Sequence, residues 1–178
     1  VYDGWGMYPI FEEEGDTWYG LDFAYGGKDR TACVKVTWLD EVYYVEEMFS
    51  IKTQKISDTV KSLMRSRVPF NAKIFADSAM PLLITDIREK GFTNIRKARK
   101  GNVEAGIKKI QDKRIVIIGD NTSHLYKSYI KFSRDKNGKL PHECDELAAL
   151  RYAINSKKPI KNPGKPKPRR ARRKKGFL

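Results

Sequence analysis

The order of the apolar segments limits the fold of this chain more than any other feature of its sequence. Residues 17–25, 31–39 and 42–49 form three extended apolar segments, and only Asp40 and Glu41 separate the second from the third. Segments that follow one another so closely pair as antiparallel strands through tight turns. The first third of the chain therefore predicts three antiparallel strands.

The rest of the chain alternates between helical and extended patterns. Apolar residues recur at helical spacing over residues 57–67, and Pro69 ends this helix before the next strand. Further strands are expected at residues 73–76, 94–98 and 114–118, and further helices at residues 81–91, 103–113, 123–128 and about 142–155. This order predicts an α/β fold with one mixed sheet and helices on both faces.

The positive charge of the chain is concentrated at one end. The chain has 178 residues and a net charge of +14, and residues 157–178 hold eleven Lys or Arg and no Asp or Glu. The other 25 basic and 22 acidic residues leave the body at +3, and its length suits one domain. We expect residues 157–178 to bind DNA without sequence specificity. The alternative is a disordered tail that only increases solubility.

Nothing in the sequence indicates secretion or a membrane. Cys33 and Cys144 lie far apart without metal-motif spacing, and no signal peptide or apolar span of about 18 residues is visible. A reducing, cytoplasmic setting is expected. The opening residues read as a linker, so residues 1–16 are interpreted as a linker, residues 17–156 as the domain and residues 157–178 as a tail.

Three aspartates that follow or begin apolar segments carry the functional prediction. Asp22 leaves the first strand, Asp77 follows residues 73–76, and Asp145 lies near the start of the last helix. Carboxylates from separate elements that meet at one sheet edge repel one another unless a cation lies between them. Such oxygen ligands suit two Mg²⁺ or Mn²⁺ ions, which together hydrolyse phosphodiesters. His142 is a candidate to complete the coordination of one ion or to orient the attacking water.

Each of these residues also has a purely structural interpretation. Asp22 could serve in a turn, and Asp77 could cap the helix that begins at Pro81. His142 and Asp145 could simply be favoured at a helix N-terminus by the helix dipole.

The last helix has a small-residue face. Ala148 and Ala149 lie one turn after Asp145 and would let its carboxylate and the His142 imidazole approach the sheet closely. Leu147, Leu150 and Ile154 are expected to form the neighbouring core stripe.

Several basic residues are candidates for binding DNA phosphates: Lys100, Lys108, Lys109, Lys131, Arg134, Lys136 and Lys139. The last four belong to residues 129–140, which are expected to form a hairpin around the Asn-Gly pair at 137–138. The alternatives are an exposed helix face for the lysines at 100–109 and a plain surface hairpin for the others.

Four blocks of the sequence resemble, in order, the nuclease domain of tailed-phage terminase large subunits. They are residues 20–26 (GLDFAYG), 76–79 (ADSA), 99–101 (RKG) and 142–152 (HECDELAALRY). The resemblance implies an RNase H-like fold and a metal-dependent endonuclease that cuts concatemeric double-stranded viral DNA during genome packaging. It also implies a catalytic, metal-binding role for Asp22, Asp77 and Asp145, with His142 as an auxiliary ligand.

The resemblance further implies partners. In this family the nuclease domain follows an ATPase motor in the same chain, and residues 1–178 contain no Walker A loop. A portal protein and a small terminase subunit are expected as partners in the host cytoplasm, and residues 157–178 could dock on the portal instead of DNA. Two alternatives stay open: a resolvase or transposase-type nuclease, and a noncatalytic DNA-binding or portal-docking module.

Overall fold

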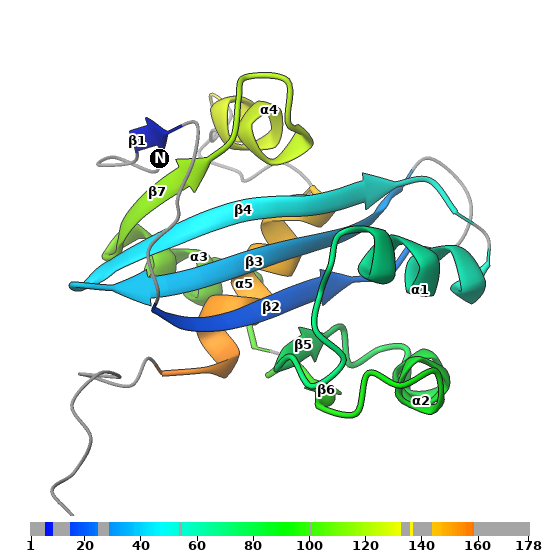
Figure 1. Ribbon diagram of the computed structural model, residues 1–178. Helices are drawn as coiled ribbons and strands as arrows, with labels where there is room; N and C mark the ends of the chain where they lie inside the picture. The colour runs from blue at the N-terminus through cyan, green and yellow to red at the C-terminus, as the bar shows by residue number, and fades with distance from the viewer. Residues whose placement is uncertain are drawn as a thin grey trace, which may run out of the picture.

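The computed structural model of the protein describes residues 6–8, 15–24, 29–53, 55–99, 101–132, 136 and 144–158. Seven strands form one sheet in the order β1-β7-β4-β3-β2-β5-β6 (Figure 1). The strands are β1 (Gly6–Tyr8), β2 (Asp16–Asp22), β3 (Thr31–Leu39), β4 (Val42–Ile51), β5 (Ile74–Ala76), β6 (Ile95–Lys97) and β7 (Arg114–Ile118). The helices are α1 (Ile56–Arg65), α2 (Pro81–Glu89), α3 (Val103–Gln111), α4 (His124–Lys131) and α5 (Asp145–Ser156).

The centre of the sheet is the predicted antiparallel meander. β2 pairs with β3 and β3 with β4 in antiparallel register. Asp40 and Glu41, with φ of 48° and 66°, make the two-residue turn between β3 and β4 in left-handed torsions. The later strands β5, β6 and β7 all pair in parallel with their neighbours, as strand-helix alternation requires. The prediction of a mixed sheet is confirmed.

Helices cover both faces of this sheet, as predicted. α1 and α2 pack on one face through a core that includes Val60, Leu63, Ile84 and Ile87. α3, α4 and α5 pack on the other face, where α5 lies behind β2 and β3 in Figure 1. The longest of these helices, α5, has 12 residues, and in the described part of the chain no helix is long and apolar enough to cross a membrane.

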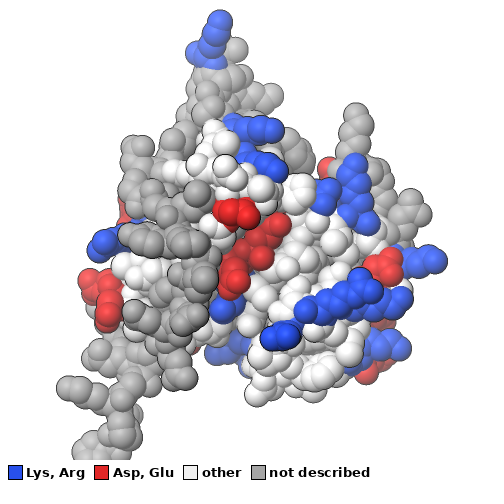
Figure 2. Space-filling view, turned by 45° about the horizontal axis from the view of Figure 1, so that its top comes forward, with Lys and Arg blue, Asp and Glu red and all other residues white. Residues whose placement is uncertain are grey.

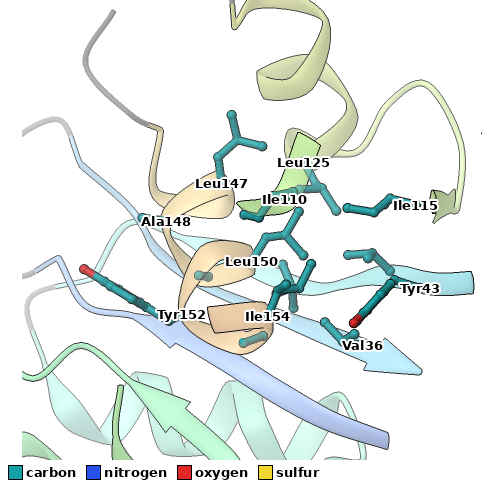
Figure 3. Packing of buried hydrophobic residues seen from close by; sticks show 14 of the residues in the cluster. Val36, Tyr43, Ile110, Ile115, Leu125, Leu147, Ala148, Leu150, Tyr152 and Ile154 are labelled. Carbon is teal, nitrogen blue, oxygen red and sulfur yellow. The ribbon is translucent and has the colours of Figure 1, made fainter. Parts of the chain in front are cut away.

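α5 is the central helix of its face and is buried from Glu146 to Ile154. It approaches β2 so closely that a Cβ atom on Gly20 would lie 1.9 Å from the carbonyl oxygen of Ala149. Leu150 and Ile154 point from α5 toward the sheet core around Val36, as Figure 3 shows. The predicted core stripe is confirmed, and Ala149 lies against the backbone of β2.

Two boundaries differ from the predictions. α5 begins at Asp145, with Cys144 as its N-cap, later than the predicted start at about residue 142. α4 extends to Lys131, so residues 129–131 are helical and do not form a hairpin strand. The reason is packing: Leu125, Tyr129 and Phe132 lie at helical spacing and contact one core. Apart from Lys136, the remainder of the expected hairpin, residues 133–140, lies outside the described residues.

A short strand occurs within the segment interpreted as a linker. Gly6–Tyr8 forms β1, which pairs in parallel with β7 at the edge of the sheet. Most of the remaining residues of that segment lie outside the described part of the chain.

Candidate functional site

Asp22 and Asp77 lie next to each other where two parallel strands end. Leu21 of β2 pairs with Ala76 of β5, and the N–H of Asp77 donates a hydrogen bond to the carbonyl of Leu21 at 2.9 Å. Gly20 faces α5, so the alternation of β2 places Asp22 on the same face. Asp22 is 9% exposed. Register therefore brings two carboxylates to one edge of the sheet.

α5 brings Asp145 to the same edge. Ala149 packs on Gly20, Asp145 lies one turn before Ala149, and Asp22 lies two residues beyond Gly20 in the direction of that edge. Arg30, just before β3, donates its backbone N–H to Asp145 Oδ2 at 2.6 Å. Because the first residues of β3 pair with the last residues of β2, this hydrogen bond ties the start of α5 to the end of β2.

A backbone N–H group orients each of the three carboxylates. The hydrogen bonds run from Phe23 to Asp22 Oδ1 at 3.1 Å, from Ala79 to Asp77 Oδ1 at 2.9 Å and from Arg30 to Asp145 Oδ2 at 2.6 Å. Such hydrogen bonds limit rotation of the side chain. Asp77 does not cap α2, because the N-cap of that helix is Met80. The capping alternative for Asp77 is therefore wrong.

The chemistry of these donors fits a divalent cation. The three carboxylates come from three elements on the same side of the sheet edge, and oxygen donors of this kind suit Mg²⁺ or Mn²⁺. In the described part of the chain, however, no three His, Cys, Asp or Glu side chains already stand in an arrangement that could hold a metal ion. His142, the predicted fourth ligand, lies outside the described residues.

Tyr152 lies close to this edge and was not anticipated. Burial is the main cause that raises the pKa of its phenol, and the negative charges of Asp22 and Asp77 raise it further. Arg151 opposes this shift, with its guanidinium carbon 4.8 Å from the centre of the Tyr152 ring. Figure 3 shows Tyr152 on the side of α5 opposite Leu150 and Ile154. The phenol thus stays protonated beside both carboxylates.

Two further acidic residues, Glu146 and Glu47, lie on the side of the site that faces α4. Glu146 is 3% exposed and accepts hydrogen bonds from Ser50 Oγ at 2.5 Å and Ser128 Oγ at 2.9 Å. Burial raises the pKa of the neighbouring Glu47, as does the charge of Glu146, although the N–H of Leu125 donates to Glu47 Oε2 at 2.5 Å.

The sequence contains a signal for Glu146. It lies four residues before Leu150 and eight before Ile154, on their stripe of the helix, where a charge must be buried. Arg30 and Ser50 have no comparable signal.

The structure separates the predicted DNA-binding residues. Lys131 is exposed one turn after Ser128, near the start of α5, and Lys136 is exposed as well. Lys108 and Lys109 are exposed on α3, a helix whose Gly106 packs on Arg151 and Asn155, in the half of α5 remote from Asp145. Outside the described residues lie Lys100, Arg134 and Lys139.

The first residue of the expected basic tail is anchored to the body. Lys157 forms an ion pair with Asp16 at the start of β2, and its Nζ lies 4.0 Å from the centre of the Trp18 ring. Burial lowers the pKa of Lys157. The expectation that Lys157 belongs to an arm available to DNA is therefore wrong. Residues 159–178 lie outside the described part of the chain.

Solved structures share this fold. The large terminase nuclease domain of bacteriophage SPP1 with bound Mn is similar with a TM-score of 0.70 and 22% identity, over 85% of this chain and 96% of that domain. The nuclease domain of the P22 large terminase matches with a TM-score of 0.64 and 18% identity, over 84% of this chain and 86% of that one. The large terminase nuclease of the thermophilic phage G20c with bound cobalt matches with a TM-score of 0.56 and 15% identity, over 85% of this chain and 93% of that one.

These likenesses establish the fold. The RNase H-like architecture predicted from the sequence blocks is confirmed. Against the large terminase of a second thermophilic bacteriophage, the match covers 87% of this chain but only 44% of that protein. No protein-family model and no curated protein matches the sequence.

Proposed function

We propose that this domain is a metal-dependent endonuclease that cuts double-stranded viral DNA during genome packaging. The proposal is supported by the positions of Asp22, Asp77 and Asp145, on three elements at one edge of a fold shared with terminase nuclease domains. Metal use is supported by the Mn and cobalt in two of those structures and by the all-oxygen donor set of this edge.

The three aspartates have distinct roles in this proposal. Asp22, Asp77 and Asp145 would hold the divalent ions, and Asp22 would be the ligand shared by two of them. The ions, Mg²⁺ or Mn²⁺, would supply Lewis acidity and an activated water for in-line phosphodiester hydrolysis. Backbone N–H groups keep the three carboxylates oriented before any ion arrives, so less side-chain freedom is lost on binding.

Exposed lysines would guide the DNA to this edge. Lys131, one turn after Ser128, is the candidate near the start of α5, and it and the exposed Lys136 would contact phosphates without reading the base sequence. Lys108 and Lys109 would contact a more distant part of the duplex.

In the full-length protein we propose that an ATPase domain presents the DNA, since the large terminase of the second thermophilic phage extends well beyond the part that matches this chain. A portal protein and a small terminase subunit complete the proposed assembly.

The first test is nicking of supercoiled plasmid at low salt with Mn²⁺, Mg²⁺ or EDTA. We expect cutting that depends on the metal and is lost in Asp22→Asn and Asp145→Asn, because an amide binds a divalent cation more weakly than a carboxylate does. Asp40→Asn is the matched control: the same change in the β3–β4 turn, at the opposite end of the strands, with left-handed torsions that Asn tolerates.

The outcomes separate the alternatives. Cutting that survives in both Asp22→Asn and Asp145→Asn would contradict the assignment of the site. No cutting by any variant, together with duplex binding, would favour the noncatalytic DNA-binding or docking module.

A further inference from the structure

A chain of hydrogen bonds connects Arg30, Ser50 and Glu146 beside the candidate site. The guanidinium of Arg30 donates from Nε to Ser50 Oγ at 2.8 Å and from a terminal nitrogen to the Ser50 carbonyl at 2.5 Å. Ser50 Oγ lies 2.5 Å from Glu146 Oε1, and Ser128 Oγ lies 2.9 Å from Glu146 Oε2. Both ends of the chain are charged, and Ser50 and Glu146 are 9% and 3% exposed.

The donors and acceptors of this chain have one consistent direction. A serine hydroxyl has one proton, and Arg30 has donors only, so Ser50 must accept from Arg30 and donate to Glu146. A hydroxyl between a cation and an anion makes two charge-assisted hydrogen bonds, which are stronger than neutral ones. The geometry of Ser50 is therefore tightly defined on both sides.

Arg30 also holds the carboxylate of Asp145. The backbone N–H of Arg30 donates to Asp145 Oδ2 at 2.6 Å, while its side chain reaches Glu146 through Ser50. Asp145 and Glu146 are the first two residues of α5. Two attachments to consecutive side chains define both the position of the helix start and its rotation about its own axis.

Strand β3 lies between Ser50 of this network and Asp22. Ser50 pairs with Ala32, and Ala32 pairs with Asp22, so the three residues form one row across β4, β3 and β2. Ala32 is fully buried and small, which leaves space above β3 for the first turn of α5.

The geometry points to Arg30, Ser50 and Glu146 as positioning residues that set the carboxylate of Asp145 for metal binding. This inference rests on the proposed metal site and adds residues that do not themselves touch the ion. Ser128 extends the network to α4, so the side of the site that carries Lys131 is tied to the same carboxylate.

The test measures metal affinity separately from stability. Ser50→Ala removes the central hydroxyl. Arg30→Lys keeps the charge but lacks the planar guanidinium that donates to both the hydroxyl and the carbonyl of Ser50. For both variants we expect the Mn²⁺ concentration that gives half of the Mn²⁺-induced rise in Tm to increase about tenfold, as is typical when the partners of metal ligands are removed. Half-maximal plasmid nicking should shift in parallel.

Two further variants make the test specific. Glu146→Gln keeps the length of the side chain and an oxygen that can accept from Ser50. We therefore expect this variant to keep most of the Mn²⁺ affinity of the wild type. Thr37→Val removes a buried hydroxyl that pairs with Thr17 at 3.1 Å near the far end of β2 and β3, and should lower Tm without changing the Mn²⁺ dependence.

Two results would overturn the inference in different ways. If Ser50→Ala and Arg30→Lys lower Tm as Thr37→Val does but keep the wild-type Mn²⁺ dependence, the network only stabilises the fold. If the wild-type protein shows neither an Mn²⁺-induced rise in Tm nor metal-dependent nicking, the metal site itself fails, and the positioning role fails with it.

Discussion

Glu47 is a half-buried carboxylate whose pKa is raised by burial and by the charge of Glu146, although Leu125 and His124 favour its charged form. It lies on β4, close to the buried Glu146, and its contact with the N–H of Leu125 only partly offsets the loss of water. A carboxyl whose pKa is raised in the folded protein binds its proton more tightly there than in the unfolded chain. Its contribution to stability is therefore lost as pH rises through the window above its usual value of 4.5.

At the residue scale we predict that Glu47→Gln is more stable than the wild type at pH 7 and that this advantage shrinks below about pH 4.5. The amide keeps an oxygen for the Leu125 N–H and removes the repulsion from Glu146. Thermal unfolding followed by circular dichroism between pH 4 and 8 would measure the difference. Glu89→Gln, the same change at an exposed position of α2, should show no such trend. A less stable Glu47→Gln at pH 7 would contradict the prediction.

The contact between α5 and β2 is the element-scale feature on which the site depends. Gly20 has no side chain, and this allows the backbone of α5 to lie against β2 at Ala149. Trp18 strengthens the contact by donating its indole N–H to the carbonyl of Ala153 at 3.0 Å. Since Asp22 and Asp145 lie on the two elements of this contact, the spacing between helix and strand sets the spacing between the two carboxylates.

We predict that Gly20→Ala lowers the free energy of unfolding by about 1–3 kcal/mol, the usual cost of overpacking. The added methyl group would meet the Ala149 carbonyl and push α5 from the sheet, so Mn²⁺-dependent nicking should fall as well. Urea unfolding and the plasmid assay measure the two effects. Gly101→Ala is the control, because nothing lies within 4 Å of the added methyl group. Equal behaviour of the two variants would rule out the close-contact argument.

At the scale of the whole molecule, α5 runs from the candidate site to the opposite end of β2. It begins at Asp145, beside the candidate site, and ends near the start of β2, where Lys157 is held by Asp16 and Trp18. Figure 1 shows the orange end of α5 on the side of the sheet away from the arrowhead of β2. On the face drawn in Figure 2, the described Lys and Arg side chains form several separate groups around a central acidic group. The described body thus has no single basic stripe on this face.

We predict that deleting residues 159–178 weakens duplex binding and makes it less dependent on salt. The deletion removes nine Lys or Arg and lowers the net charge from +14 to +5, while Lys157 keeps its contacts. Each lost phosphate contact should reduce the slope of log K against log salt by about 0.9. Fluorescence anisotropy with a labelled duplex at several salt concentrations measures this slope, and the Mn²⁺-induced rise in Tm should be unchanged. An unaltered slope would contradict the assignment of these residues to DNA binding and would leave portal docking and increased solubility as the alternatives.

Local patterns in the sequence were sufficient for most elements. β3 and β7 begin and end where their apolar runs predict, and Pro81 marks the start of α2. Pro and turn residues act within a few positions of the chain, so their effects are readable without a structure. The three aspartates were identifiable for a related reason, since each follows or begins an apolar segment. Tertiary contacts overrode the local pattern in α4, where packing of Tyr129 and Phe132 extends the helix.

The sequence by itself determined most of the elements, the α/β class and the three candidate carboxylates, because these depend on periodicity and turn chemistry within short segments. Only the tertiary structure decided the order of the strands, the approach of Ala149 to Gly20 and the anchoring of Lys157. It also decided that Arg30, Ser50 and Glu146, at 20 and 96 residues of separation, form one hydrogen-bonded chain. Such contacts arise from the register between strands and from the position of a helix on a sheet, and no local pattern encodes either of them.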